Sequence, residues 1–305
     1  MAFILKSNKV VIDLNNDYKY LTALGPTTKD IYDYVNELKI KDYLITQNEF
    51  DSLNSYVSSL KEIGAWNSFV EFLPLFGNNV NAQMVKLKYI NNKNGVSVNN
   101  FNNANVDNGK GLIWNEHTRY ESPCIDLGFT QNDVFNLKGF GSVIHSKYKS
   151  PGVHNYSSFF GAGVSYPDSI FLHSANINGT NIGSKLLQRA STGATNLAIA
   201  NTIFSIQKWT TNKSLYEDKV YVDGISVINN NVTTTLSLTG VHNNTSFYLG
   251  ATNVDIVSPN FNTEYSFYGG IRFFALHDAS MSFTMQEEIT NLTNSFILQS
   301  GKTFI

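Results

Sequence analysis

Acidic residues are the first candidates for chemistry, because two carboxylates on one face of a strand can act as the acid and the nucleophile of glycoside hydrolysis. Side chains at alternate strand positions share a face. Glu217 and Asp218 are adjacent, so on a strand they would point to opposite faces. Glu287 and Glu288 stand where a helix is expected to begin and favour its positive N-terminal end. The sequence therefore predicts no catalytic residues and no enzyme.

The histidines and the cysteine do not show the spacing of a metal site. The paired-histidine and His-Glu-x-x-His patterns that bind zinc do not occur. The six histidines are His117, His145, His154, His173, His242 and His277. The single cysteine, Cys124, follows Pro123 in an apolar run and is predicted to be a small buried residue. These residues predict neither a metal site nor a cofactor.

Calcium is the one ion that stays open as an alternative. It binds oxygen ligands, which Asp223, Asp255 and Asp278 could supply together with nearby Asn side chains. The sequence lacks the Asp-x-Asp-x-Asp-Gly run of a dedicated calcium loop, and Asp223 already precedes Gly224 in a predicted tight turn. We therefore expect structural roles for these aspartates.

Aromatic side chains in loops offer another kind of site, because an exposed ring can stack on a sugar ring. Tyr156 and Tyr166 lie in segments with many Gly, Pro, Ser and Asn residues, which predict loops. These two tyrosines are the candidates for carbohydrate binding. The competing interpretation is that most of the 13% aromatic residues form a core, which we prefer for Trp209.

The composition is that of a folded protein with little net charge. Hydrophobic residues make up 42% of the 305 residues, charged residues make up 15%, and the net charge is −2. These values argue against a disordered chain and against a basic surface for nucleic acid. No apolar run is long enough to span a bilayer or to form the core of a signal peptide. We expect no nucleic-acid partner, no membrane insertion and synthesis in a cytoplasm.

Two helical patterns occupy the first 90 residues. Thr27 and Thr28 can cap a first helix. A capping box over residues 46–49 begins a second helix, whose apolar residues, spaced 3, 4 and 3 apart, are Phe50, Leu53, Val57 and Leu60. This spacing fits either a helix packed on its own domain or a short coiled-coil stem between identical chains. Fewer than two heptads favour the first interpretation.

A concentrated apolar strip follows over residues 66–77 and includes Trp66, Phe69, Phe72 and Leu75. These residues either cover the core of the neighbouring domain or form a docking surface. Because a head of about 90 residues leaves much of its surface exposed, this strip and the second helix are predicted to drive docking and self-association. Residues 1–90 are therefore expected to form an attachment and oligomerisation region, with a strand at 85–90. Residues 91–111 are expected to be an Asn-rich linker or long turn.

Beyond residue 112, short alternating apolar runs recur between Gly, Asn, Asp and Pro residues, which indicates an antiparallel β-sandwich. The expected strands are 143–148, 157–160, 170–173, 197–209, 219–222, 246–249 and 265–276. Asp223 and Gly224 are expected to form a tight hairpin turn, and a short helix is expected from Ser282 onward. The predicted fold class is mainly β, with a small α-containing N-terminal region and a C-terminal antiparallel β-sandwich.

Three landmarks in this region resemble the concanavalin A-like and laminin-G-like jelly rolls. They are, in order, Tyr221-Val222-Asp223-Gly224, then Phe247-Tyr248-Leu249-Gly250, then Tyr268-Gly269-Gly270-Ile271-Arg272-Phe273 before the C-terminal helix. The resemblance covers about residues 112–305 and is one of strand order and turn chemistry. It implies a lectin-like jelly roll over those residues.

The whole layout resembles virion proteins of tailed bacteriophages, with a helical head, a Pro74-Leu75-Phe76-Gly77 corner and a Val85-Lys86-Leu87 run before a lectin-like domain. This resemblance implies a structural head fibre, capsid decoration or tail appendage, displayed on the virion and made in the host cytoplasm. The implied partners are identical chains in a homotrimer, capsid or tail proteins of the same particle, and host-surface glycans. The alternatives are a carbohydrate-binding lectin module and, less favoured, a glycoside hydrolase on the same fold.

Overall fold

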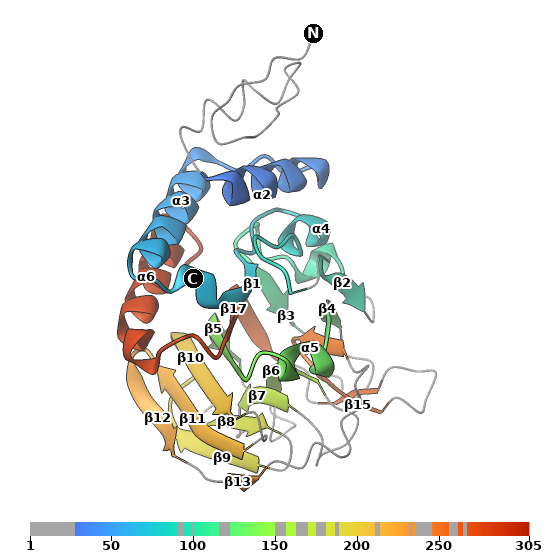
Figure 1. The fold of residues 1–305 in the computed structure, drawn as a ribbon. Coiled ribbons are helices and arrows are strands. Elements are labelled where there is room, and N and C mark those ends of the chain that lie inside the picture. Colours follow the sequence, from blue (N-terminus) through green and yellow to red (C-terminus); the bar gives the residue numbers. More distant parts are fainter. Residues whose placement is uncertain are drawn as a thin grey trace.

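The computed structural model describes residues 28–90, 94–98, 101–115, 123–149, 157–162, 170–174, 181–186, 189–210, 214–231, 234–235, 246–255, 262–264 and 267–304. Two antiparallel sheets pack face to face, and helices lie along the outer face of one of them (Figure 1). The expected fold class, mainly β with an antiparallel sandwich and a few helices, is confirmed. Within these ranges no helix has both the length and the apolar character needed to cross a membrane.

The first sheet contains the longest strands of the chain. Its hydrogen-bonded order is β1 (Phe69–Leu73), β17 (Gly269–Asp278), β5 (Gly139–Tyr148), β10 (Ala200–Trp209), β11 (Ser214–Val222) and β12 (Ile225–Asn230). Two short strands extend it, β3 (Leu112–Trp114) beside β17 and β13 (Thr234–Thr235) beside β11. The turn between β11 and β12 has positive φ at both Asp223 (48°) and Gly224 (80°), so the predicted tight hairpin is confirmed.

The second sheet has shorter strands and packs against the inner face of the first. Its order is β2 (Val96–Val98), β4 (Cys124–Thr130), β14 (Ser246–Leu249), β6 (Ser157–Ala162), β7 (Ile170–Ser174), β8 (Asn181–Leu186) and β9 (Arg189–Ala194). A separate hairpin pairs β15 (Thr252–Asp255) with β16 (Asn262–Glu264). Cys124 is buried at the start of β4, as predicted for a small apolar residue.

Thr28 and Thr46, both expected as capping residues, are the N-cap residues of the first two helices, although the Thr28 side chain makes no capping hydrogen bond. The helices are α2 (Lys29–Ile40), α3 (Gln47–Glu62), α4 (Val80–Gln83), α5 (Gln131–Phe135) and α6 (Gln286–Gln299), with 3-10 turns η1 (Trp66–Ser68), η2 (Asn103–Asn105) and η4 (Phe283–Met285). Thr46 and Glu49 form the expected capping box at the start of α3, with the Thr46 backbone N–H donating to Glu49 Oε2 at 2.8 Å. Local side-chain hydrogen bonds therefore mark the start of α3, as predicted.

Aromatic residues fill the space between the two sheets. Phe129 and Phe247 stack with ring centres 5.0 Å apart, and Phe140 packs against Phe247 at 5.5 Å. Phe160 of the second sheet meets Phe274 of the first at 5.5 Å. These contacts make one continuous core between the sheets.

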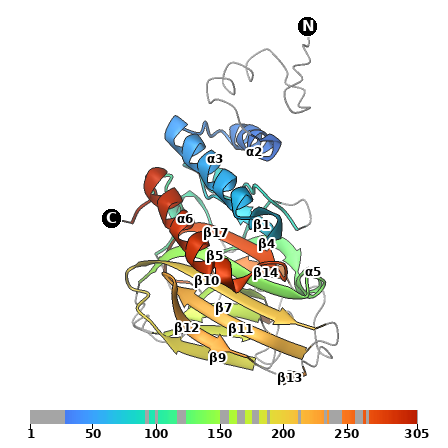
Figure 2. The same cartoon turned by 60° about the vertical axis from the view of Figure 1, so that its left-hand side comes forward.

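A second core lies on the outer face of the first sheet, beneath α3 and α6. Figure 2 shows these two helices running side by side over the sheet. Tyr56 of α3 stacks on Phe296 of α6 at 5.0 Å, and its hydroxyl lies 2.7 Å from Thr293 Oγ1. Phe273 reaches the same cluster from β17, 5.6 Å from the Tyr56 ring. Strand β17 is therefore covered on both faces, which explains why apolar residues occupy the consecutive positions Phe273 to Leu276.

The predicted docking residues belong to the folded cores of the chain: Leu75 lies in the core between the sheets, and the others lie in the outer core. Each is 5% exposed or less, and all are buried by elements of the same chain: Phe50, Leu53, Val57, Leu60, Trp66, Phe69, Phe72 and Leu75. The prediction that they form an exposed docking strip is corrected, because the first sheet offers them an apolar face that a head of 90 residues would lack. Packing of α3 on its own chain is thus the interpretation that the structure supports.

The expected boundary at residues 91–111 does not separate two cores. Strand β1 pairs with β17, and β2 pairs with β4 from within the expected linker. The strand predicted at 85–90 is replaced by an irregular segment with one bridge, between Phe72 and Lys88. Lys88 holds this segment through its side chain in place of strand pairing, because its Nζ donates to the carbonyl oxygens of Trp66 (2.6 Å) and Phe69 (2.9 Å).

Candidate ligand-binding site

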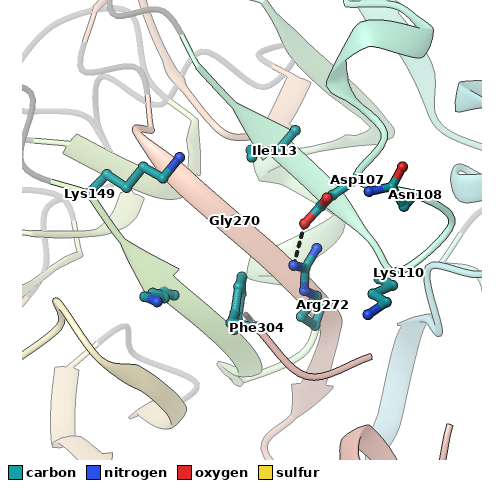
Figure 3. A pocket seen from close by; sticks show the side chains of 9 residues that line it. Asp107, Asn108, Lys110, Ile113, Lys149, Gly270, Arg272 and Phe304 are labelled. Atoms are coloured by element: carbon teal, nitrogen blue, oxygen red, sulfur yellow. Dashed lines mark hydrogen bonds and ion pairs between the residues drawn. The ribbon is translucent and has the colours of Figure 1, made fainter. Parts of the chain in front are cut away.

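A pocket of about 220 Å³ opens beside the start of β17 (Figure 3). Its walls come from β3, β5, β17, the turn at 107–111 and the segment after α6, which are far apart in the sequence. The lining residues are Asp107, Asn108, Lys110, Ile113, Lys147, Lys149, Gly270, Arg272 and Phe304. We refer to this cavity as the Arg272 pocket.

A β-bulge in β17 directs Arg272 toward this pocket. The pairing with β5 shifts between Ile271, which faces Ser146, and Phe273, which faces His145, so Arg272 is the extra residue. Ile271 packs in the core between the sheets and Phe273 packs in the outer core, so the strand changes face at the bulge. A regular strand would place these two residues on the same face.

Arg272 is buried, with 2% of its surface exposed, and its hydrogen bonding is incomplete. Its Nη2 donates to the carboxylate of Asp107, and its Cζ lies 4.1 Å from the centre of the Phe304 ring. Its Nε and Nη1 are buried and have no acceptor. Burial lowers the pKa of the guanidinium, and the bond to Asp107 opposes that shift. Unpaired N–H groups of a buried cation are unusual and costly.

A tight turn holds Asp107 in place. The Asp107 backbone N–H donates to Gly111 O at 3.0 Å, and the Lys110 N–H donates to Asp107 O at 2.8 Å. Asn108 and Gly109 both have positive φ, at 48° and 76°. A Cβ on Gly111 would lie 2.4 Å from the Ile271 carbonyl oxygen, so the turn approaches β17 closely because this residue has no side chain.

The segment after α6 supplies the Phe304 wall. Lys302 is buried, and its Nζ donates to the carbonyl oxygens of Pro74 and of Leu75, the latter at 2.8 Å. This anchor places the Phe304 ring in a stacked arrangement with His145, with ring centres 5.9 Å apart. Burial, followed by the charges of Arg272 and Lys302, lowers the pKa of His145 to about 4. His145 is therefore neutral near pH 7.

Positive charge dominates the lining of the pocket. Among the described residues that form it, four are cationic (Lys110, Lys147, Lys149 and Arg272) and one, Asp107, is a carboxylate, a difference of three. The whole chain has a net charge of −2, so this concentration is local. Lys149 is exposed, and Lys110 and Lys147 are half-buried, so their ammonium groups can meet a ligand from solvent. Such an arrangement attracts anions.

The acids considered from the sequence do not meet in a pair. Asp218 faces the second sheet and accepts hydrogen bonds from Ser184 Oγ at 3.0 Å and Ser191 Oγ at 2.7 Å. Glu217 lies on the other face, 3.7 Å from Lys208 Nζ and 3.3 Å from Lys219 Nζ. The two carboxylates therefore have the opposite orientations expected for adjacent strand residues.

The calcium candidates have structural partners or lie apart. Asp223 accepts a hydrogen bond from Thr202 N at 2.8 Å, and Asp278 accepts one from Ser280 N at 2.9 Å, near opposite ends of β10. The side chain of Asp255 lies outside the described residues. Across the part of the chain that the structure describes, no group of three or more His, Cys, Asp or Glu residues could hold a metal ion.

The predicted carbohydrate-binding tyrosines, Tyr156 and Tyr166, lie outside the described residues. Sequence reasoning missed the Arg272 pocket. The signal that could have found it is a single arginine within the apolar run from Ile271 to Leu276, because a lone cation inside a buried strand needs a partner.

No protein-family model matches this chain, and no curated protein matches it. Solved structures are similar in part. The Ruminococcus gnavus IT-sialidase CBM40 is 16% identical, with a TM-score of 0.44, over 59% of this chain and 96% of that one. Domain 4 of AbnA, a GH43 extracellular arabinanase from Geobacillus stearothermophilus in complex with arabinotriose, is 15% identical, with a TM-score of 0.38, over 65% of this chain and 88% of that one.

The NanB sialidase from Streptococcus pneumoniae is 16% identical, with a TM-score of 0.40, over 52% of this chain. This chain spans 25% of that sialidase structure. Similarities of this size carry no argument about a site or an activity. The assignment of the chain as a mainly β protein with an antiparallel sandwich rests on its own strand pairing.

Proposed function

We propose that this chain is a non-enzymatic binding module that holds one residue of a glycan in the Arg272 pocket. The observation that carries the proposal is the pocket itself, which is built on paired strands and lined by several hydrogen-bond donors. At about 220 Å³ it is smaller than the ~300–1,000 Å³ pockets that hold drug-sized ligands. A single sugar residue is a ligand of suitable size and polarity.

The lining supports binding more than catalysis. Among the described residues around the pocket, the one carboxylate is Asp107, and it is bonded to Arg272. Glycoside hydrolysis needs two carboxyl groups, one of which donates a proton. Asn108, Lys110 and Lys149 offer donors to sugar hydroxyls, and Ile113 offers an apolar surface. We therefore propose recognition without bond cleavage.

The display role on a bacteriophage particle is a separate proposal that rests on the sequence resemblance alone. A glycan-binding module on a head fibre, capsid decoration or tail appendage would hold the particle to host-surface glycans. The homotrimeric state and the capsid or tail partners belong to the same proposal. Immunogold labelling of purified particles with an antibody against this chain tests it, and labelling absent from all particle surfaces would contradict it.

A glycan array tests the binding function. The wild-type chain is expected to bind at least one class of glycan. The Ile113→Trp variant, which fills the pocket from a half-buried strand position, is expected to lose that binding at least tenfold. Ile225→Trp is the matched control, because Ile225 is 69% exposed in the β11–β12 hairpin, away from the pocket lining. Binding by neither protein, or equal binding by Ile113→Trp and wild type, would contradict the proposal.

A further inference from the structure

We propose that the ligand of the Arg272 pocket is an acidic sugar, bound through its carboxylate or sulfate group. This inference rests on the proposed glycan-binding function and names its ligand class. A neutral sugar would leave the ammonium groups of Lys110, Lys147 and Lys149 without a charge partner in the pocket. An anionic group can accept charge-assisted hydrogen bonds from them, which are about twice as strong as neutral ones.

Two of these lysines share one wall of the pocket with Arg272. Lys147 lies on β5 directly opposite Gly270 of β17, two residues before Arg272. Lys149 follows β5, and its backbone N–H donates to Tyr268 O at 2.9 Å, which holds it beside the same strand. Because Gly270 has no side chain, the edge of the Phe304 ring can lie over the strand between Lys147 and Arg272, and this space opens when the ring turns away. The cations therefore surround a region that one anionic group can enter.

Arg272 is the pocket cation with buried N–H groups that lack an acceptor. Its Nε and Nη1 are buried and have no acceptor, although Nη2 is bonded to Asp107. A carboxylate already accepts from this guanidinium at Nη2, so the chemistry of the pocket suits a second one. These N–H groups are already removed from water in the unliganded protein. A ligand oxygen that reaches them therefore forms hydrogen bonds without a further desolvation cost at the guanidinium.

Phe304 is the side chain that an incoming anion must displace. Its ring lies 4.1 Å from Arg272 Cζ, and its edge would lie 2.5 Å from a Cβ at position 270. The ring is partly exposed, whereas Lys302 anchors the segment two residues earlier. A change in the Phe304 side-chain torsion can therefore uncover the guanidinium while the anchor stays in place. The ring gives up a cation–π contact, which is replaced by an ion pair.

Matched sugars test the ligand class. Isothermal titration compares methyl glucuronide and methyl glucoside 6-sulfate with methyl glucoside, which differ at C6. We expect one or both acidic sugars to bind at least about tenfold more tightly than the neutral one. The affinity should fall as salt rises from about 0.05 M to about 0.5 M. The two acidic arms show whether carboxylate or sulfate is preferred, and equal binding of all three sugars would overturn the inference.

Charge variants locate the effect. The double variant Lys147→Gln/Lys149→Gln is expected to bind the acidic sugar about fivefold to thirtyfold more weakly, so that its preference for the acidic sugar over methyl glucoside falls. Lys29→Gln/Lys138→Gln is the matched control, because both lysines are exposed and neither lines the pocket. The Arg272→Gln variant should also lose acid preference. If Arg272→Gln does not fold, the Lys147→Gln/Lys149→Gln variant is the test. An affinity of that variant for the acidic sugar equal to that of wild type would overturn the inference.

The displacement step has its own readout. Phe304→Ala removes the cover from Arg272 and is expected to bind the acidic sugar about threefold to tenfold more tightly. Weaker binding would assign Phe304 to the sugar contact surface and overturn the step. Failure of the two proposals is distinguishable. If no glycan of any charge binds, the binding function is wrong, whereas neutral glycans that bind as tightly as acidic ones overturn the ligand class alone.

Discussion

Replacing Phe72 with alanine should unfold the chain more easily without changing its assembly. The Phe72 side chain is fully buried in the outer core. Its ring packs against Tyr56 (5.8 Å), Trp66 (5.3 Å), Phe69 (5.5 Å) and Phe273 (5.0 Å). A buried Phe→Ala change costs about 3–5 kcal/mol, and four aromatic neighbours place Phe72 near the upper end. That is a large share of a typical free energy of unfolding of about 5–15 kcal/mol.

Urea denaturation followed by tryptophan fluorescence measures the effect. With a dependence of about 2–3 kcal/mol per molar urea, a loss of about 4 kcal/mol lowers the midpoint by about 1.3–2 M. Phe283→Ala is the matched control and should cost about 1 kcal/mol or less, because Phe283 is 38% exposed on η4. Light scattering should give the same mass for all three proteins. An unchanged midpoint together with a reduced mass for Phe72→Ala would refute the core assignment and restore the docking one.

Three further predictions concern stability. Gly224→Ala should cost about 1–2 kcal/mol in the thermal unfolding free energy, because φ is +80° there and no neighbouring atom blocks the new Cβ; an unchanged melting temperature would contradict the turn geometry. Burial lowers the pKa of His277 to about 4, so the folded state resists its protonation and stability is lost as pH falls from about 6.5 to about 4. The free energy of unfolding of wild type should fall by about 3 kcal/mol more than that of His277→Gln over that window. His145 and Glu71 titrate in both proteins, so their effects cancel in this difference. Parallel curves of stability against pH for the two proteins would contradict the prediction. Lys86→Met should lower the free energy of unfolding in urea by about 3–5 kcal/mol, because Glu71, 2.9 Å from Lys86 Nζ, would be a buried carboxylate without its cation. The double variant Lys86→Met/Glu71→Leu should recover most of this loss, and no recovery would contradict the pairing.

Features fixed by neighbouring residues could be predicted from the sequence. The capping box of Thr46 and Glu49, the tight turn at Asp223 and Gly224, and the alternation of the long strands all depend on local chemistry. The pairing of β1 with β17 could not, because it joins residues about 200 positions apart, such as Phe69 and His277. Without that pairing, the apolar strip at 66–77 looked like a surface in need of a partner.

The binding site was harder to predict than the fold. The sequence contains Arg272 as a single cation in an apolar run, a signal that was missed, and the β-bulge that directs its side chain toward the pocket has no local sequence signature. Asp107 and Phe304 reach Arg272 from segments 165 and 32 residues away along the chain. Carbohydrate binding by Tyr156 and Tyr166 stays a prediction, because both residues lie outside the described part of the chain.

The position of a bound acidic sugar tests the central claim most directly. A crystal of the full chain soaked with the acidic sugar that binds best in titration would show its location. We predict density for the anionic group beside Lys147 and Lys149, with Phe304 rotated away and Arg272 in contact with the ligand. Density confined to Tyr156 and Tyr166, with the Arg272 pocket unchanged, would contradict the account.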